Sequence, residues 1–317
     1  MTQSHHVFSG LLAQANATPP IQTAVVWPLS DLSLQGACEA AREHVIAPVL
    51  IGPPDRLAAL AQLERLDISG FALVEAASEA EAAAKGVELC RAGKARILMK
   101  GSLHTDAFMH AVMQDGTGLR GTRRISHVFI FDVPRYPHVL MITDAAVNIA
   151  PNLMEKADIV QNAIDLAHVL GMPEPKVAIL SAVETVNPKI QSTIDAAALC
   201  KMAERGQITG GLLDGPLAFD NAVNLKAARV KHLSSPVAGQ ADVLVVPDLE
   251  SGNMLAKQLE YLAGAEAAGI VLGARVPIVL TSRADGPKAR LASAAVAALL
   301  AEAQLPKELG AGASPDE

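Results

Sequence analysis

Residues 95–101, ARILMKG, form a short hydrophobic run that ends in Lys100 and Gly101, and the next residues, SLHT (102–105), open a helical stretch. The same order of an aliphatic run and an amphipathic stretch of roughly ten to fifteen residues recurs along almost the whole chain. Such alternation is typical of βαβ units and predicts a largely parallel sheet. The runs are hydrophobic throughout, as expected for strands that are covered on both faces. The sequence therefore predicts an α/β fold.

The pattern also places the individual elements. Strands are predicted over 23–29, 45–52, 71–76, 95–101, 127–133, 139–144, 176–182, 208–215, 242–248 and 277–282, and helices over 31–44, 155–170, 189–205 and 253–268. Asp31 and Ser251 are expected to cap helix N-termini, and Gly171, Gly206 and Gly269 to follow helix C-termini.

Composition excludes several classes of protein. Of the 317 residues, 50% are hydrophobic and 19% charged, which is not the composition of a disordered chain, and the length favours two domains. With 3% aromatic residues and a net charge of −7, nucleic-acid binding is disfavoured. The three cysteines lie far apart and form neither a disulfide framework nor a zinc pattern. The net charge also argues mildly against an anionic partner, unless basic residues gather at one place.

The chain shows no signal for a membrane or for secretion. Its N-terminus, MTQSHHVFSG, lacks the features of a signal peptide, and no run approaches the roughly 20 apolar residues of a membrane span. A soluble, cytoplasmic protein is expected.

One motif is misleading. Residues 116–121, GTGLRG, match the dinucleotide-binding pattern G-x-G-x-x-G, which must follow a strand and open a helix. Here the motif follows the helical stretch 103–115 and precedes the strand at 127–133. A helix-to-strand loop is therefore expected.

The nine histidines form no zinc-binding pattern, and no metal site is expected.

Three strand ends carry polar side chains, and ligands of open α/β sheets bind beyond the carboxyl ends of strands. Lys100 ends the first strand, and Ser102 and Thr105 open the helix that follows it, a combination that suits an anion. The second end leads from Asp248 to Asn253 at the start of a helical stretch.

The third strand end is the string VLTSRAD (279–285). Ser282, Arg283 and Asp285 supply a hydroxyl, a guanidinium and a carboxylate within four residues, which suits an oxyanion donor, a phosphate ligand and a base. A further loop, GLRGTRR (118–124), brings together Arg120, Arg123 and Arg124 and is a candidate clamp for phosphates.

Seven segments resemble the phosphate acetyltransferase and phosphate butyryltransferase family. They follow the order of that family from about residue 95 to residue 300, and they are LMKGSLHT (98–105), ISHVFIFDVP (125–134), TDAAVNIAP (143–151), KVAILSAVE (176–184), DGPLAFDNA (214–222), ADVLVVPDLESGNMLAKQL (241–259) and GARVPIVLTSRAD (273–285).

The resemblance implies a particular architecture. We expect two three-layer α/β/α domains with a cleft between them, as in the isocitrate and isopropylmalate dehydrogenases. Residues 1–143 plus 285–317 would form the first domain, completed by the C-terminal helix, and residues 144–284 the inserted second domain. A homodimer and the short form of the family, without an extra N-terminal domain, are also implied.

The implied reaction is the reversible transfer of a short acyl group, acetyl as the first choice, between CoA and inorganic phosphate. CoA is a substrate, and no tightly bound cofactor is implied. The resemblance assigns Arg283 to phosphate and Ser282 to the oxyanion or phosphate. A base must take the proton of the CoA thiol, whose pKa is about 8.5, and Asp285 and Asp144 are both candidates.

Further residues are expected around the phosphate and CoA sites, at the cleft: Lys100, Ser102, Thr105, Arg120, Arg123, Arg124, Asn148, Asp220, Asn253 and Lys257. Acetyl-type members of the family carry Ser-Arg-Gly and an Asp where this chain has Ala289. Asp285, three residues after Ser282, is typical of butyryl-type members. Family members often have a cysteine where Ala145 stands, so that this nucleophile is missing here.

Other functions stay open at this point. One is phosphate butyryltransferase activity on butyryl or branched-chain acyl-CoA, because one methylene group contributes only about 1–3 kcal/mol to discrimination. An NAD-dependent dehydrogenase on the same fold and a non-catalytic CoA-binding protein are remoter alternatives.

Overall fold

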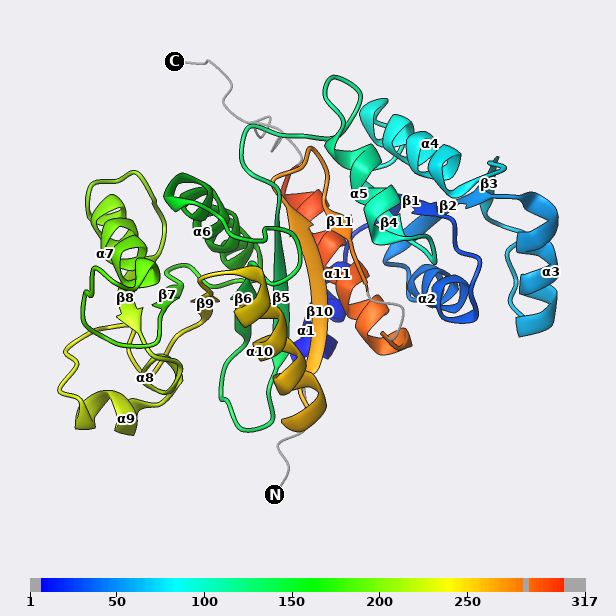
Figure 1. Cartoon of the computed structure of the whole chain (residues 1–317). Coiled ribbons are helices and arrows are strands. Elements are labelled where there is room, and N and C mark those ends of the chain that lie inside the picture. Colours follow the sequence, from blue (N-terminus) through cyan, green and yellow to red (C-terminus); the bar gives the residue numbers. More distant parts are fainter. Residues whose placement is uncertain (1–6, 282–284, 305–317) are drawn as a thin grey trace, which may run out of the picture.

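The computed structural model describes residues 7–281 and 285–304. One twisted sheet of eleven strands runs through this part of the chain, with helices on both of its faces (Figure 1). The strand order is β3-β2-β1-β4-β11-β10-β5-β6-β9-β7-β8. The α/β fold predicted from the sequence is confirmed.

The strands are β1 (Ile21–Val26), β2 (Ile46–Gly52), β3 (Ala72–Glu75), β4 (Ile97–Lys100), β5 (Ser126–Asp132), β6 (Leu140–Thr143), β7 (Lys176–Leu180), β8 (Leu212–Leu217), β9 (Val243–Val245), β10 (Glu266–Leu272) and β11 (Ile278–Val279). The helices are α1 (Val7–Ala15), α2 (Asp31–Arg42), α3 (Pro54–Glu64), α4 (Glu79–Arg91), α5 (Thr105–Met113), α6 (Leu153–Val169), α7 (Gln191–Glu204), α8 (Phe219–Val223), α9 (Leu225–Val230), α10 (Leu249–Leu262) and α11 (Pro287–Ala303).

The sheet is largely parallel, as predicted, but its centre is antiparallel. β1 to β4 and β11 pair in parallel on one side, and β6 to β9 on the other. Between these halves, β10 is antiparallel to both β11 and β5, and β5 is antiparallel to β6. The division of the chain into two domains stays a prediction, whereas the sheet itself is continuous.

The helix predicted over 253–268 is wrong at its C-terminal end. The helix, α10, ends at Leu262, and residues 266–272 form β10, in the middle of the sheet. Residues 263–268, AGAEAA, are rich in alanine, which favours helix locally. Pairing with β5 and β11 on its two sides overrides that preference.

Several helix ends also differ from the prediction. Ser30 caps α2 in place of Asp31, and Asp248 caps α10 by accepting a hydrogen bond from the backbone N–H of Ser251. Gly171 and Gly206 do follow helix ends with positive φ, as predicted. Gly269 instead lies inside β10.

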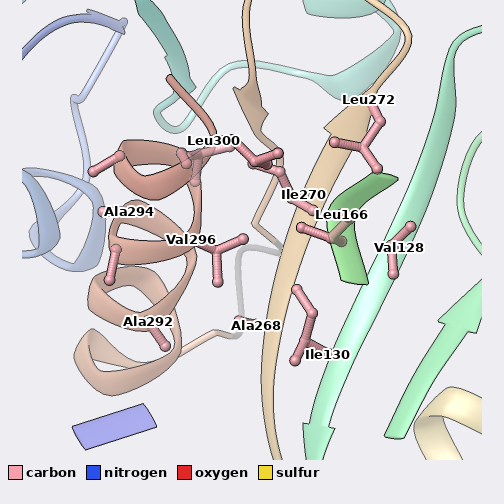
Figure 2. Packing of buried hydrophobic residues seen from close by; sticks show 14 of the residues in the cluster. Val128, Ile130, Leu166, Ala268, Ile270, Leu272, Ala292, Ala294, Val296 and Leu300 are labelled. Carbon is pink, nitrogen blue, oxygen red and sulfur yellow. The ribbon is translucent and has the colours of Figure 1, made fainter. Parts of the chain in front are cut away.

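The core is built in layers on the two faces of the sheet. On one face, β5 and β10 pack against α11 and α6 through aliphatic side chains, among them Val128, Ile270 and Val296 (Figure 2). The helices α1, α2 and α7 belong to the same layer. On the opposite face, α4 and α5 cover one half of the sheet and α10 the other. The side chains of β5 that point to this second face are His127, Phe129 and Phe131, because the alternate residues Val128 and Ile130 belong to the first layer.

Two further expectations can be compared with the structure. The loop 116–121 connects α5 to β5, so the dinucleotide motif is in the helix-to-strand position that the sequence indicated. Among the described residues, none of the helices is both long enough and apolar enough to span a bilayer.

Candidate functional site

A cavity of 520 Å³ lies over the centre of the second face of the sheet, between α5 and α10. We call it the central cavity. It is lined by Lys100, His104, Thr105, Asp106, His127, Phe129, Ala146, Leu249, Asn253, Lys257, Leu280, Thr281 and Asp285.

Strand register explains why side chains from distant parts of the sequence share the cavity floor. Met99 of β4 is in register with Val279 of β11, which is opposite Ile270 of β10. One residue further along these strands, Lys100, Leu280 and Gly269 lie side by side in a row across the sheet. Gly269 is in turn opposite Phe129 of β5. Because side chains alternate along strands, the members of this row point to the same face.

The first turn of α5 forms one wall of the cavity. Its N-cap, His104, provides no side-chain hydrogen bond to the helix, and Thr105 and Asp106 line the cavity. Backbone N–H groups at a helix N-terminus are suited to bind an anion. Lys100, which is only 3% exposed, adds positive charge to the floor of the same cavity.

The opposite wall is α10, which contributes Asn253 and Lys257. The Lys257 ammonium forms an ion pair with Glu260 at 2.8 Å. Burial disfavours the charged ammonium, but the hydrogen bond to Glu260 and the nearby Asp285 carboxylate raise the pKa of Lys257 overall. Lys257 is therefore a cation at neutral pH, and the Asp285 carboxylate lies close enough for an electrostatic interaction with it.

His127 is a buried histidine in the floor of the cavity that sequence reasoning did not find. Its side chain is 1% exposed, and its ring packs edge-on against Phe129 with the centroids 4.4 Å apart. Burial lowers its pKa to about 3, so the imidazole is neutral. The signal for it was available: His127, Phe129 and Phe131 alternate along one strand in a chain with very few aromatic residues.

Asp144 is oriented toward its own loop. Its carboxylate accepts hydrogen bonds from the backbone N–H groups of Ala146, Val147 and Asn148, and from the Asn148 side chain. Burial raises the pKa of Asp144, and these hydrogen bonds act in the opposite direction. Asn148 in turn accepts a hydrogen bond from Arg124 at 2.7 Å. Asp144 and Asn148 thus order the loop after β6, and of this loop Ala146 lines the central cavity.

The arginine-rich loop lines a different cavity, of 430 Å³, which also contains Glu155 and Asp158. Each arginine has a carboxylate partner, and of these three partners Glu155 lines the same cavity. Arg120 pairs with Asp115 at 2.7 Å, Arg124 with Glu155 at 2.9 Å, and Arg123 with Asp165. The structure does not bring these arginines to the cavity that contains Lys100.

Two other predicted residues do not line the central cavity. The Ser102 hydroxyl donates to the carbonyl of Trp27 at 3.0 Å and accepts from the N–H of Leu29, so it joins the loop after β4 to the loop after β1. Asp220 is exposed in the first turn of α8, which follows the edge strand β8, and four strands separate β8 from β10 in the sheet.

Ser282 and Arg283 lie outside the described residues. The residues on either side of them are held by Arg290, a buried side chain of α11 that the sequence did not single out. Its guanidinium donates to the Thr281 hydroxyl at 2.8 Å and to the Asp285 carbonyl at 3.1 Å. Gly36 leaves room for this side chain, because a Cβ there would lie 2.8 Å from Arg290 Cδ.

The structure thus brings together five of the predicted site residues: Lys100, Thr105, Asn253, Lys257 and Asp285. Their individual roles stay predictions. In the described part of the chain, no group of His, Cys, Asp and Glu side chains is arranged to hold a metal ion.

An α/β sheet with a polar cavity over its central strands, lined by two lysines and the start of a helix, defines an enzyme-type cleft for an anionic substrate. Comparison with known proteins gives the family. Residues 55–298 match the family described as "Phosphate acetyl/butaryl transferase", and the chain belongs to this family.

Two curated relatives and two solved structures are similar to the chain. The phosphate acetyltransferase of Rhizobium meliloti is 60% identical over 93% of both chains, and the phosphate butyryltransferase of Clostridium acetobutylicum is 38% identical over 93% of this chain and 98% of its own. A branched-chain phosphotransacylase from Enterococcus faecalis V583 superposes with a TM-score of 0.78 at 29% identity, covering 89% of this chain and 99% of the other. The 4-hydroxythreonine-4-phosphate dehydrogenase of Klebsiella pneumoniae, at 10% identity and a TM-score of 0.55, covers 89% and 99% and shares the fold.

Proposed function

We propose that the chain is a phosphate acetyltransferase, which catalyses acetyl-CoA + phosphate ⇌ acetyl phosphate + CoA. The 60% identity with a phosphate acetyltransferase over nearly the whole chain supports acetyl over butyryl, because phosphate butyryltransferases are 38% and 42% identical. The observation that carries the proposal is the central cavity, where Lys100, Lys257 and the first turn of α5 surround Asp285 and Asn253.

Phosphate would be held by positive charge. Lys100 is buried in the floor and Lys257 stands on α10 in the opposite wall, so an anion between them would meet a cation on two sides. Hydrogen bonds between charged partners are roughly twice as strong as those between neutral ones. We propose Thr105 and Asn253 as further hydrogen-bonding partners of phosphate or CoA at the rim.

Asp285 is the base that the geometry favours. A carboxylate that lines the cavity can take the CoA thiol proton, and Asp285 lies near the Lys257 ammonium in the same cavity. Asp144 is the weaker candidate because its carboxylate already accepts four hydrogen bonds from its own loop. Arg283 as a phosphate ligand and Ser282 as an oxyanion or phosphate ligand remain proposals that rest on the family resemblance.

The arginine-loop cavity is a candidate for the more distant phosphates of CoA. Arg120 and Arg123 are each paired with one exposed carboxylate, and exposed ion pairs are worth only about 0–1 kcal/mol. A phosphate could therefore replace these partners at little cost.

The direct test is an assay of the purified protein with acetyl-CoA and phosphate. We expect thiol release that depends on phosphate, with one acetyl phosphate formed for each CoA. Asp285→Asn should lower kcat about 10²- to 10⁴-fold, as expected for loss of a general base. An unchanged kcat in Asp285→Asn would exclude this base.

A panel of C2 to C5 acyl-CoAs, compared by kcat/KM, would identify the preferred acyl group. Preference for butyryl-CoA would favour the alternative of a phosphate butyryltransferase. Reduction of NAD with a hydroxy acid would indicate a dehydrogenase, and CoA binding without turnover of any acyl-CoA would indicate a binding protein.

We also propose a homodimer, as the family resemblance implies. The exposed face of α10 carries Met254, Tyr261 and Leu262, which are 59%, 66% and 85% exposed, and a second copy could cover them. Light scattering on the purified chain would measure the mass in solution.

A further inference from the structure

The imidazole of His127 has a buried polar atom without a partner. Its Nδ1 is shielded from solvent and has no hydrogen-bond partner among the described residues. Leaving such an atom unsatisfied costs about 1–3 kcal/mol. Buried polar atoms in native proteins are nearly always satisfied, and an exception in a side chain that lines a cavity calls for an explanation such as a catalytic role.

The position of this ring is built by the strands around it. Gly269, on the neighbouring strand β10, has no side chain, and a Cβ there would lie 2.9 Å from His127 Nε2. Phe129 holds the ring from the side of β5, with its centroid 4.4 Å away. The backbone oxygen of His127 accepts a hydrogen bond from the Thr143 hydroxyl at 2.9 Å, which fixes the strand beneath.

We propose that His127 is a catalytic residue of the acyl transfer, and that an imidazole N–H donates a hydrogen bond to the carbonyl oxygen of the acyl group. This inference rests on the proposed phosphate acetyltransferase function. A phosphate oxygen attacks the thioester carbon while the base takes the proton of the phosphate hydroxyl, the C=O electron pair moves onto oxygen, and a tetrahedral intermediate with an anionic oxygen forms. When the C=O bond reforms, the C–S bond breaks, and the CoA thiolate leaves and takes a proton from the protonated base. His127 keeps its own proton throughout.

The surroundings of His127 indicate the acyl oxygen as its partner. Two lysines and two aspartates line the cavity; the lysines attract anionic ligands, whose oxygens accept hydrogen bonds. Lys100 and Lys257 are placed to hold the phosphate, whereas His127 lies beside Phe129 and Leu280, in the apolar part of the floor. A hydrogen-bond donor directed at a developing oxyanion stabilises it most where water is excluded.

Neutrality suits this role. Burial holds the pKa of His127 near 3, so the ring can donate a hydrogen bond without transferring a proton. A neutral imidazole that polarises a carbonyl oxygen is known from other enzymes.

Two variants and a matched control test the assignment. His127→Leu removes the donor, and His127→Asn restores an N–H near the position of Nδ1. Phe131→Leu is the control, because Phe131 points to the same face of β5 and does not line the central cavity. We expect kcat to fall about 10²- to 10³-fold in His127→Leu. KM for phosphate should change by less than about threefold, because the interaction is made in the transition state. His127→Asn should recover part of the loss, and Phe131→Leu should keep its activity.

A spectroscopic measurement gives an independent answer. The infrared C=O stretch of acetyl-CoA labelled with ¹³C at the carbonyl should lie at lower frequency on the wild-type protein than on His127→Leu. If His127→Leu does not fold, the comparison is made between wild type and His127→Phe, whose ring also lacks an N–H donor.

Two results would overturn the proposal: an unchanged kcat in His127→Leu, with or without a rise in the KM for phosphate, or identical C=O frequencies in the compared proteins. A wild-type protein that shows no phosphate-dependent turnover would instead refute the proposed function, so the two failures are distinguishable.

Discussion

Gly269→Ala is the sharpest test of how the sheet positions the site. The added Cβ would lie 2.9 Å from His127 Nε2, 3.4 Å from Cε1 of the same ring and 3.5 Å from the Leu280 carbonyl oxygen. Favourable contacts between non-bonded heavy atoms begin at about 3.5 Å, so the ring must retreat by about 0.6 Å. β10 itself is held in place, because the Gly269 N–H donates to the Ser293 hydroxyl at 2.9 Å and the strand pairs with β5.

The magnitude follows from this displacement. Moving a reacting group by 1 Å can cost about 100-fold in rate, so a shift of about half that size should lower kcat roughly tenfold. Overpacking should also lower the free energy of unfolding by about 1–3 kcal/mol. The measurements are steady-state kinetics with acetyl-CoA and phosphate, and urea unfolding followed by circular dichroism.

The matched control is Gly10→Ala. No atom lies within 4 Å of a Cβ at Gly10, which is inside α1. This change should leave kcat unaltered and raise the free energy of unfolding by about 0.5–1 kcal/mol, because glycine weakens a helix interior. Wild-type kcat and stability in Gly269→Ala would refute the reasoning, as would an equal loss of activity in Gly10→Ala.

Three further predictions concern charge and thiol chemistry. Lys100→Met should raise the KM for phosphate about 10- to 100-fold, since a hydrogen bond to a charged group is worth about 1.5–3 kcal/mol; an unchanged KM would exclude Lys100 as a phosphate ligand. Lys156→Met or Asp195→Leu alone should lower the free energy of unfolding in urea by about 3–5 kcal/mol, because each leaves one charge of a buried 2.7 Å ion pair without its partner. The double variant should recover most of this loss, and additive losses would contradict the coupling. Burial raises the pKa of all three cysteine thiols, to about 11 for Cys38 and about 12 for Cys90 and Cys200, so little thiolate exists at pH 8. The native protein should therefore react with Ellman's reagent far more slowly than free CoA. A rate equal to that of CoA would contradict the burial of these thiols.

The sequence located a substantial part of the candidate site because strand ends are visible in it. Lys100 and Thr105 flank the end of a hydrophobic run, and Asn253 and Lys257 lie at the start of an amphipathic stretch, so local patterns were sufficient to select them. The same patterns gave equal weight to the arginine loop, whose side chains line another cavity. Basic residues close together in sequence do not reveal which surface they share.

By itself, the sequence determined the α/β class, most of the strands and helices, and the residues that end the strands, because hydrophobic periodicity is a local property of the chain. The tertiary structure decided what depends on pairing between distant segments. It made a strand of residues 266–272, placed that strand between β11 and β5, and thereby set Gly269 beside His127. It also turned Asp144 toward its own loop and brought Asp285 into the central cavity. These outcomes follow from strand register and the burial of polar atoms, which are non-local and have no signature in the order of the residues.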